Sequence, residues 1–260
     1  MKKWFACSGQ GILDGVEQTG RVAILFGQTL QFTLLARWKR KNMVEQMMNI
    51  GVGSLPVIII TAAFLGMVLA LQSYYQLHRL GVEAGIGALV GVSMAREVGP
   101  VMTGILLTAR VGASMAAELG TMKVTEQIDA LQALATNPIQ YLVVPRFLAC
   151  LILVPLLTVY TIFIGIAGGY LIGVKMMGIN SAFYLSHTIS LLGAMNILTG
   201  LIKAVFFGII IATVSCYKGL TARGGAEGVG RATTGAVVTS CILILIGDFF
   251  LTLIFKIANL

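Results

Sequence analysis

Four ionisable residues interrupt stretches of the sequence that are otherwise apolar: Arg96, Glu97, Lys203 and Asp248. Charged side chains are costly to hold at membrane depth, so they usually face a bundle interior or a cavity and have partners. Two are cationic and two are anionic, so they would neutralise one another at a common depth. The pattern indicates either an ion-pair network that holds helices together or a set of groups that line or gate a substrate path. Pro100 follows closely and weakens the helix at this point, which favours a site that moves.

The apolar stretches around these charges have the length of transmembrane helices. About 20 mostly apolar residues cross the hydrocarbon core of a bilayer. The chain of 260 residues is 57% hydrophobic and only 11% charged, whereas soluble domains carry about 25% charged residues. The sequence therefore predicts an all-α integral membrane protein with five spans, at residues 52–74, 84–109, 147–174, 191–217 and 232–255.

The positions of the four charges within these spans predict a shared depth. We place the outer ends of spans 2, 4 and 5 near Gly87, Gly193 and Ala258. The charges then lie about nine to eleven residues inward, which is roughly 14–16 Å at about 1.5 Å per residue. That depth is close to the midplane of a hydrocarbon core about 30 Å thick.

The basic residues outside the spans predict the orientation of the chain. Twelve lysines and arginines fall on the side that holds the N-terminus, and three, Arg79, Lys175 and Lys256, fall on the other. Cytoplasmic loops carry the excess of lysine and arginine. We therefore expect a cytoplasmic N-terminus and a C-terminus on the opposite side.

The first 45 residues do not form a sixth span, because Arg21, Gln28 and Gln31 interrupt their apolar positions. The basic run Trp38–Lys41 follows. This pattern is typical of a helix that lies in the cytoplasmic membrane interface, with its basic end near anionic headgroups; a solvated basic tail is the alternative. We expect one domain, made of this interfacial region (1–45) and a five-helix bundle (46–260).

No residue pattern predicts catalysis. The four cysteines are far apart, and neither histidine has neighbours at metal-ligand spacing. The glycine-rich stretch Gly224–Arg231 lacks the lysine followed by Ser or Thr that a phosphate loop needs, so we expect a flexible cytoplasmic connector there. The basic residues are not interleaved with aromatics as in a nucleic-acid surface. We expect no metal, no cofactor in this chain and no nucleic-acid partner.

The loop between spans 2 and 3 contains a short predicted helix over Lys123–Leu134. We expect Thr125 to cap it and Asn137-Pro138 to stop it. Its apolar side consists of Ile128, Leu131 and Leu134, with Glu126 and Asp129 off that side. A short amphipathic helix of this kind docks in a groove of a partner or lies on its own bundle. The sequence leaves both open.

Glycines also recur every four residues in span 3, at Gly165, Gly169 and Gly173. Small residues at this spacing let helix backbones approach closely in lipid. We expect helix packing within one subunit, with a dimer contact as the alternative.

Long segments of the chain, in the right order from about Arg37 onward, closely resemble the MlaE/YrbE family. These segments are Met94–Pro100, Ala109–Ala113, Ala117–Leu131, Asn137-Pro138, Val144–Phe147, Gly230–Thr234 and Gly247–Phe249. The resemblance implies a homodimeric, non-enzymatic permease of an ABC transporter that moves phospholipids between the inner and outer membranes and maintains outer-membrane lipid asymmetry. It implies a bacterial inner-membrane protein with its C-terminus in the periplasm.

The resemblance also implies partners and roles for particular residues. The partners are a pair of ATPase subunits that bind ATP and Mg, a hexameric MCE-domain protein in the periplasm and, in many systems, a STAS-domain protein. The coupling helix to the ATPase would comprise Thr125, Glu126, Ile128, Asp129, Leu131 and Leu134. A lipid cavity between the two subunits would be lined by Leu65, Leu69 and Tyr74, and Arg96, Glu97, Lys203 and Asp248 match the family's intramembrane charges.

Two rival functions fit the same residues. An ion-coupled secondary transporter would use Glu97 and Asp248 as proton sites, although such chains usually contain an internal repeat and none is visible here. A non-transporting membrane anchor for an MCE complex would tolerate substitutions at all four charges.

Overall fold

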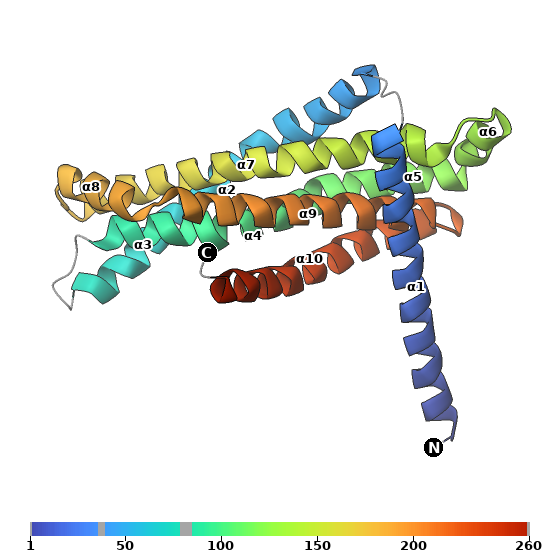
Figure 1. Ribbon diagram of the computed structural model, residues 1–260, viewed down its shortest axis with the longest axis horizontal. Coiled ribbons are helices and arrows are strands. Elements are labelled where there is room, and N and C mark those ends of the chain that lie inside the picture. Colours follow the sequence, from blue (N-terminus) through green and yellow to red (C-terminus); the bar gives the residue numbers. More distant parts are fainter. Residues whose placement is uncertain (1, 36–39, 79–84, 259–260) are drawn as a thin grey trace.

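The computed structural model describes residues 2–35, 40–78 and 85–258, and this part of the chain is helical throughout its regular structure (Figure 1). The α-helices are α1 (Lys2–Leu35), α2 (Arg40–His78), α3 (Ile86–Ser93), α4 (Gly99–Leu107), α5 (Ala113–Val124), α6 (Gln127–Ala133), α7 (Val144–Tyr170), α8 (Ser181–Leu191), α9 (Ala194–Leu220) and α10 (Gly225–Ile257). Short π-helical segments, in which hydrogen bonds join residues five apart, are η2 (Met94–Val98), η3 (Thr108–Gly112), η4 (Ile139–Val143) and η5 (Leu171–Met176).

Five helical segments among the described residues are long and apolar enough to cross a membrane. They are Asn42–His78, Ile86–Val124, Ile139–Met176, Ala194–Leu220 and Gly225–Ile257. This confirms the predicted all-α membrane protein. The outer ends at Ile86, Ala194 and Ile257 lie within one residue of the predicted positions.

Spans 1, 2, 3 and 5 are longer than predicted at the end near α6, and span 2 differs most. The second helical segment does not stop at Ala109 but continues through η3 and α5 to Val124, a total of 39 residues. At about 1.5 Å per residue it is roughly 58 Å long, nearly twice the thickness of the hydrocarbon core. Arg110 ends the apolar run but not the helix, because the alanine-rich residues after it still favour helix. Span 2 therefore reaches well beyond the membrane.

Glycines allow α2 and α7 to pack with their backbones in contact. A methyl group added at Gly66 would collide with the carbonyl of Gly165, and one added at Gly168 would collide with the carbonyl of Ala63. A methyl group at Gly173 would meet the ring of Tyr184 in α8 at 2.8 Å. The predicted packing of the span 3 glycines within one subunit is thus confirmed.

The buried apolar residues form three clusters between the helices. The largest cluster joins α2, α4, α7, α9 and α10 through buried residues such as Ile58, Leu107, Leu157, Phe207 and Ile244. Many large apolar side chains of α2 and α10 nevertheless remain exposed, among them Phe64, Phe249 and Phe250. In a single chain these faces have no protein covering, so they must meet lipid or another subunit.

Helix α1 crosses the end of the bundle that carries α6 (Figure 1). Leu25 is buried there, and the rings of Phe26 and Phe147 lie 6.0 Å apart. The direction across the spans is the one expected for a helix that lies along a membrane surface. Trp38 and Lys39 belong to the basic run that was predicted to lie near anionic headgroups, and both lie outside the described residues. Arg79, one of the three basic residues predicted on the opposite side of the membrane, also lies outside them.

The glycine-rich stretch after α9 is not a flexible connector, as the sequence suggested. Gly224 and Gly225 form the turn, with left-handed φ values of 93° and 66°, and α10 begins at Gly225. A methyl group at Gly228 would collide with the carbonyl of Arg223, so glycine is required for this tight entry into the helix.

Candidate functional site

Three of the four predicted intramembrane charges meet in one cluster around Lys203. Its ammonium group forms an ion pair with Glu97 and a second with Asp248, where the N–O distance is 2.8 Å. It also donates a hydrogen bond of 2.7 Å to the hydroxyl of Thr252, which in turn donates to the backbone carbonyl of Asp248. The side chain of Lys203 is only 1% exposed, whereas that of Glu97 is 41% exposed. The cluster therefore joins spans 2, 4 and 5 and presents one carboxylate at the surface of the chain.

The charges of span 2 lie in a π-helical segment. The backbone N–H of Gly99 donates to the carbonyl of Met94, five residues earlier. Pro100 follows and has no N–H to donate, so the regular α-helical ladder is interrupted here. Arg96 precedes Glu97 in this segment and is half-buried. The sequence predicted weakness at this point from Pro100; the structure shows that it takes the form of a π-turn.

A glycine lets α9 approach this π-turn. A methyl group added at Gly200 would collide with the carbonyl of Ala95 and meet Pro100 at 3.2 Å. Gly200 lies about one helical turn before Lys203. Close contact of the two backbones therefore sets the distance across which Lys203 reaches Glu97.

The three residues predicted to line a lipid cavity pack within the subunit. Leu65, Leu69 and Tyr74 of α2 are partly buried against the core cluster of Ala70, Ile86, Val90, Met94, Ile179 and Tyr184. Tyr74 also stacks on His78, with ring centroids 5.0 Å apart. Their role in a cavity between two subunits stays a prediction.

The predicted coupling helix exists as α6, but Thr125 does not cap it. The Thr125 hydroxyl donates to the carbonyl of Thr121, so this residue closes the end of α5. Glu126 occupies the N-cap position with a left-handed φ of 61°. That conformation costs energy for a residue with a side chain, and it makes the connection between α5 and α6 very tight. A salt bridge of 2.8 Å between Lys123 and Asp129 crosses the same turn.

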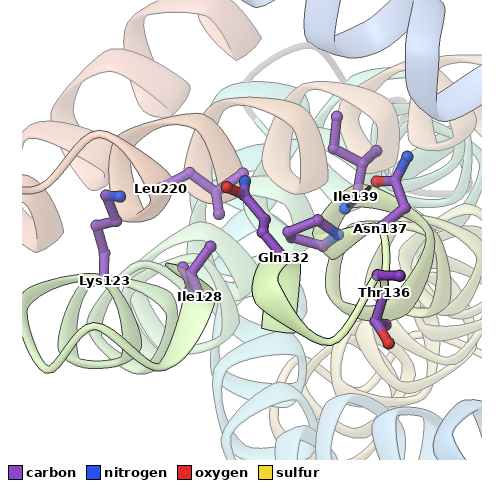
Figure 2. Close-up of a pocket in the computed structure, with 9 residues that line it drawn as sticks. Lys123, Ile128, Gln132, Thr136, Asn137, Ile139 and Leu220 are labelled. Atoms are coloured by element: carbon purple, nitrogen blue, oxygen red, sulfur yellow. Dashed lines mark hydrogen bonds between the residues drawn. The ribbon is translucent and has the colours of Figure 1, made fainter. Parts of the chain in front are cut away.

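The apolar side of α6 mostly faces its own bundle. Ile128 is buried and Leu131 is partly buried against Leu119, Leu142 and Cys216, whereas Leu134 is 75% exposed. Figure 2 shows Ile128 and Gln132 beside Leu220 at a pocket of about 540 Å³ between α6 and the end of α9. The outward surface of α6 is therefore mostly polar, with Glu126, Asp129 and Gln132 exposed, and Leu134 is the large apolar side chain exposed beside them.

Arg110, which the count of basic residues omitted, adds a further cation on the α6 side of the bundle. Its guanidinium donates to the Ser54 hydroxyl at 2.7 Å and to the Asn49 carbonyl at 3.3 Å, and lies against Gly53. Farther along span 2, Glu118 pairs with the buried Arg146 at 2.9 Å. Arg110 and Glu118 both lie in segments that resemble the family. Only the fold shows that Arg110 fastens span 2 to α2 and that Glu118 fastens it to α7.

Comparison with known proteins decides the family. A family profile described as Permease MlaE matches residues 43–254. The chain belongs to the MlaE permease family. Its relatives include a "Probable ABC transporter permease protein" of Rickettsia typhi, 49% identical over 215 residues that cover 82% of this chain and 83% of the relative.

Two relatives with lower sequence identity come from a cyanobacterium and a plant. A "Probable ABC transporter permease protein" of Synechocystis is 43% identical over 228 residues, which cover 88% of this chain and 87% of the relative. The Arabidopsis thaliana protein trigalactosyldiacylglycerol 1, chloroplastic, is 37% identical over 234 residues, 90% of this chain and 67% of the relative. This MlaE family chain is thus a multi-pass transporter permease, and the ABC class implies a separate ATPase partner.

Proposed function

We propose that this permease moves phospholipids between the inner and outer membranes, works as a homodimer with a periplasmic MCE-domain protein, and is driven by its ATPase partner. The main support for a lipid substrate is the similarity to an Arabidopsis protein that is named for a lipid, trigalactosyldiacylglycerol. The apolar faces that α2 and α10 expose support it, because acyl chains need such walls. A bacterial inner-membrane location, with the N-terminus in the cytoplasm, and an accessory STAS-domain protein belong to the same proposal.

The geometry of span 2 supports a route from the ATPase to the charged cluster. The outward surface of α6, with Glu126 and Leu134, would dock on the ATPase. The tight turn and the Lys123–Asp129 salt bridge fasten α6 to α5, and α5 is continuous with the helix that carries Glu97. A displacement of α6 would therefore act along one continuous helical segment, and the π-turn at η2 is the point in it that adjusts most easily.

The charged cluster would respond to such a displacement in a discrete way. Ion pairs on a buried ammonium are either formed or broken, because a partly separated pair at membrane depth is costly. Glu97 is the exposed member, so movement of span 2 would change its contact with Lys203 first. Arg96, next to it, is the candidate partner for a lipid phosphate.

Purification of the membrane complex tests this function against its rivals. The tagged permease would be extracted from its own membranes, and its partners and bound lipids identified by mass spectrometry. The proposal expects an ATPase subunit and phospholipid in stoichiometric amounts. A permease that carries no phospholipid would support a non-transporting anchor, and transport by the permease without any ATPase would support a secondary transporter; either result contradicts the proposal.

A further inference from the structure

A polar cleft lies where α1 crosses the end of α9, distant from the charged cluster. Its volume is about 390 Å³. It is lined by Glu17, Gln18, Arg21, Tyr217, Lys218, Thr221 and Arg223. The lining thus combines three cationic side chains, from α1, from the last turn of α9 and from the connection to α10, with one carboxylate.

Two of these cations have no anionic partner within the described residues. Arg21 pairs with Glu17 at 2.5 Å, in a surface salt bridge whose side chains are both more than half exposed. Neither Lys218 nor Arg223 forms an ion pair or a side-chain hydrogen bond in the described part of the chain. Lys218 lies in the last turn of α9, where the helix dipole attracts a cation. The helix dipole therefore accounts for the position of Lys218, but not for that of Arg223, which lies beyond the end of α9.

The predicted mid-membrane depth of the charged cluster places the cleft at the depth expected for lipid headgroups. Lys218 follows Lys203 by 15 residues in α9, about 22 Å along the helix axis. With the charged cluster near the midplane, this distance reaches the headgroup layer, because half of a complete bilayer is about 20–22 Å thick. On α1, Ile24 and Leu30 are exposed, and acyl chains would cover such apolar side chains. The depth expected from the helix rise and the exposed apolar side chains farther along α1 both favour a lipid environment for the cleft.

We propose that this cleft binds the headgroup phosphate of an anionic phospholipid in the cytoplasmic leaflet, which fastens α1 to spans 4 and 5. Basic pockets between helices on the cytoplasmic side of a membrane bind acidic headgroups in this way. Lys218 and Arg223 supply the charge, Thr221 and Gln18 offer hydrogen bonds, and Tyr217, almost fully buried, forms the floor. This lipid is a fixed ligand and is not the transported one, so the proposal is independent of the proposed function.

Native mass spectrometry of the purified permease tests the site with phosphatidylglycerol as the probe and phosphatidylcholine as the neutral comparison. Each basic residue near an anionic surface contributes about 1 kcal/mol, which is roughly a fivefold change in affinity. Lys218→Gln and Arg223→Gln are each expected to weaken binding of one phosphatidylglycerol about fivefold, and the double variant about 25-fold. Gln18→Glu, which adds negative charge to the cleft, weakens it as well.

The matched control is Arg231→Gln, which removes a cation from the same end of the molecule but outside the cleft. Arg231 is 71% exposed and pairs with Glu227, so its loss is expected to leave phosphatidylglycerol binding unchanged. An equal loss in this control would overturn the site in favour of general surface charge. Competition by inorganic phosphate as strong as that by the lipid would show a site for free phosphate. Normal lipid binding with loss of the ATPase subunit in the cleft variants would show a protein-docking surface, and both results contradict the proposal.

Discussion

Removal of Lys203 tests whether the charged cluster holds spans 2, 4 and 5 together. The Lys203→Met variant keeps the length of the side chain but leaves Glu97 and Asp248 without their shared cation. Breaking a buried ion pair by removing one partner costs about 3–5 kcal/mol, and Lys203 is almost fully buried. For a domain of this size, 1 kcal/mol shifts the unfolding temperature by about 2–4 °C. We therefore expect a decrease of about 6–20 °C.

Thermal unfolding of the purified permease in detergent measures this decrease. The matched control is the triple variant Lys203→Met, Glu97→Gln, Asp248→Asn, which removes all three charges. Because no uncompensated carboxylate remains, it should unfold within about 4 °C of the parent, which corresponds to about 1 kcal/mol. A single variant that unfolds at the parental temperature, or a triple variant as unstable as the single one, would refute the network. Lipid transport by the triple variant then separates the two roles, since a gating role predicts that transport stays lost when stability returns.

Four further predictions concern other parts of the molecule. Gly66→Ala forces a methyl group against the Gly165 carbonyl and should destabilise the permease by about 1–3 kcal/mol, whereas Gly27→Ala in α1, with open space around it, should be neutral or slightly stabilising; equal unfolding temperatures would contradict the close α2–α7 crossing. Gly200→Ala should separate α9 from η2 and reduce both stability and transport; full transport by the variant would show that this contact does not matter. Leu134→Asp should abolish co-purification of the ATPase while the unfolding temperature stays unchanged, because this side chain is 75% exposed; retention of the ATPase would remove Leu134 from the docking surface. Alkaline phosphatase fused after Leu260 should be active in the periplasm and inactive when inserted after Thr221; the reverse pattern would invert the orientation.

The sequence predicted the number of spans, their outer ends and the charged residues, because lipid imposes strict limits on length and charge. It did not predict the inner ends of spans 1, 2, 3 and 5, since a helix that leaves the membrane loses its apolar signal but not its helical conformation. Nor did it predict which way α6 faces: the periodicity of Ile128, Leu131 and Leu134 defines an apolar side, but only the neighbouring helices decide that this side packs inward.

Other features depended on contacts between distant parts of the chain. The pairing of Lys203 with Glu97 and Asp248 was open from the sequence, because opposite charges at one depth do not specify partners. The cleft between α1 and α9 gave no signal at all, since Arg21 and Arg223 are about 200 residues apart in the chain. The left-handed turn at Glu126 was likewise invisible, because glycine or asparagine is the residue that usually marks such a turn.

ATP-dependent lipid transfer measures the central claim most directly. The permease and its ATPase partner would be reconstituted in liposomes that contain a fluorescent phospholipid, with the soluble MCE domain as acceptor, and transfer would be followed with and without ATP. Our account predicts transfer that requires ATP and that is lost in the Leu134→Asp variant. Transfer of equal rate without ATP, or transfer that follows an imposed proton gradient, would contradict it.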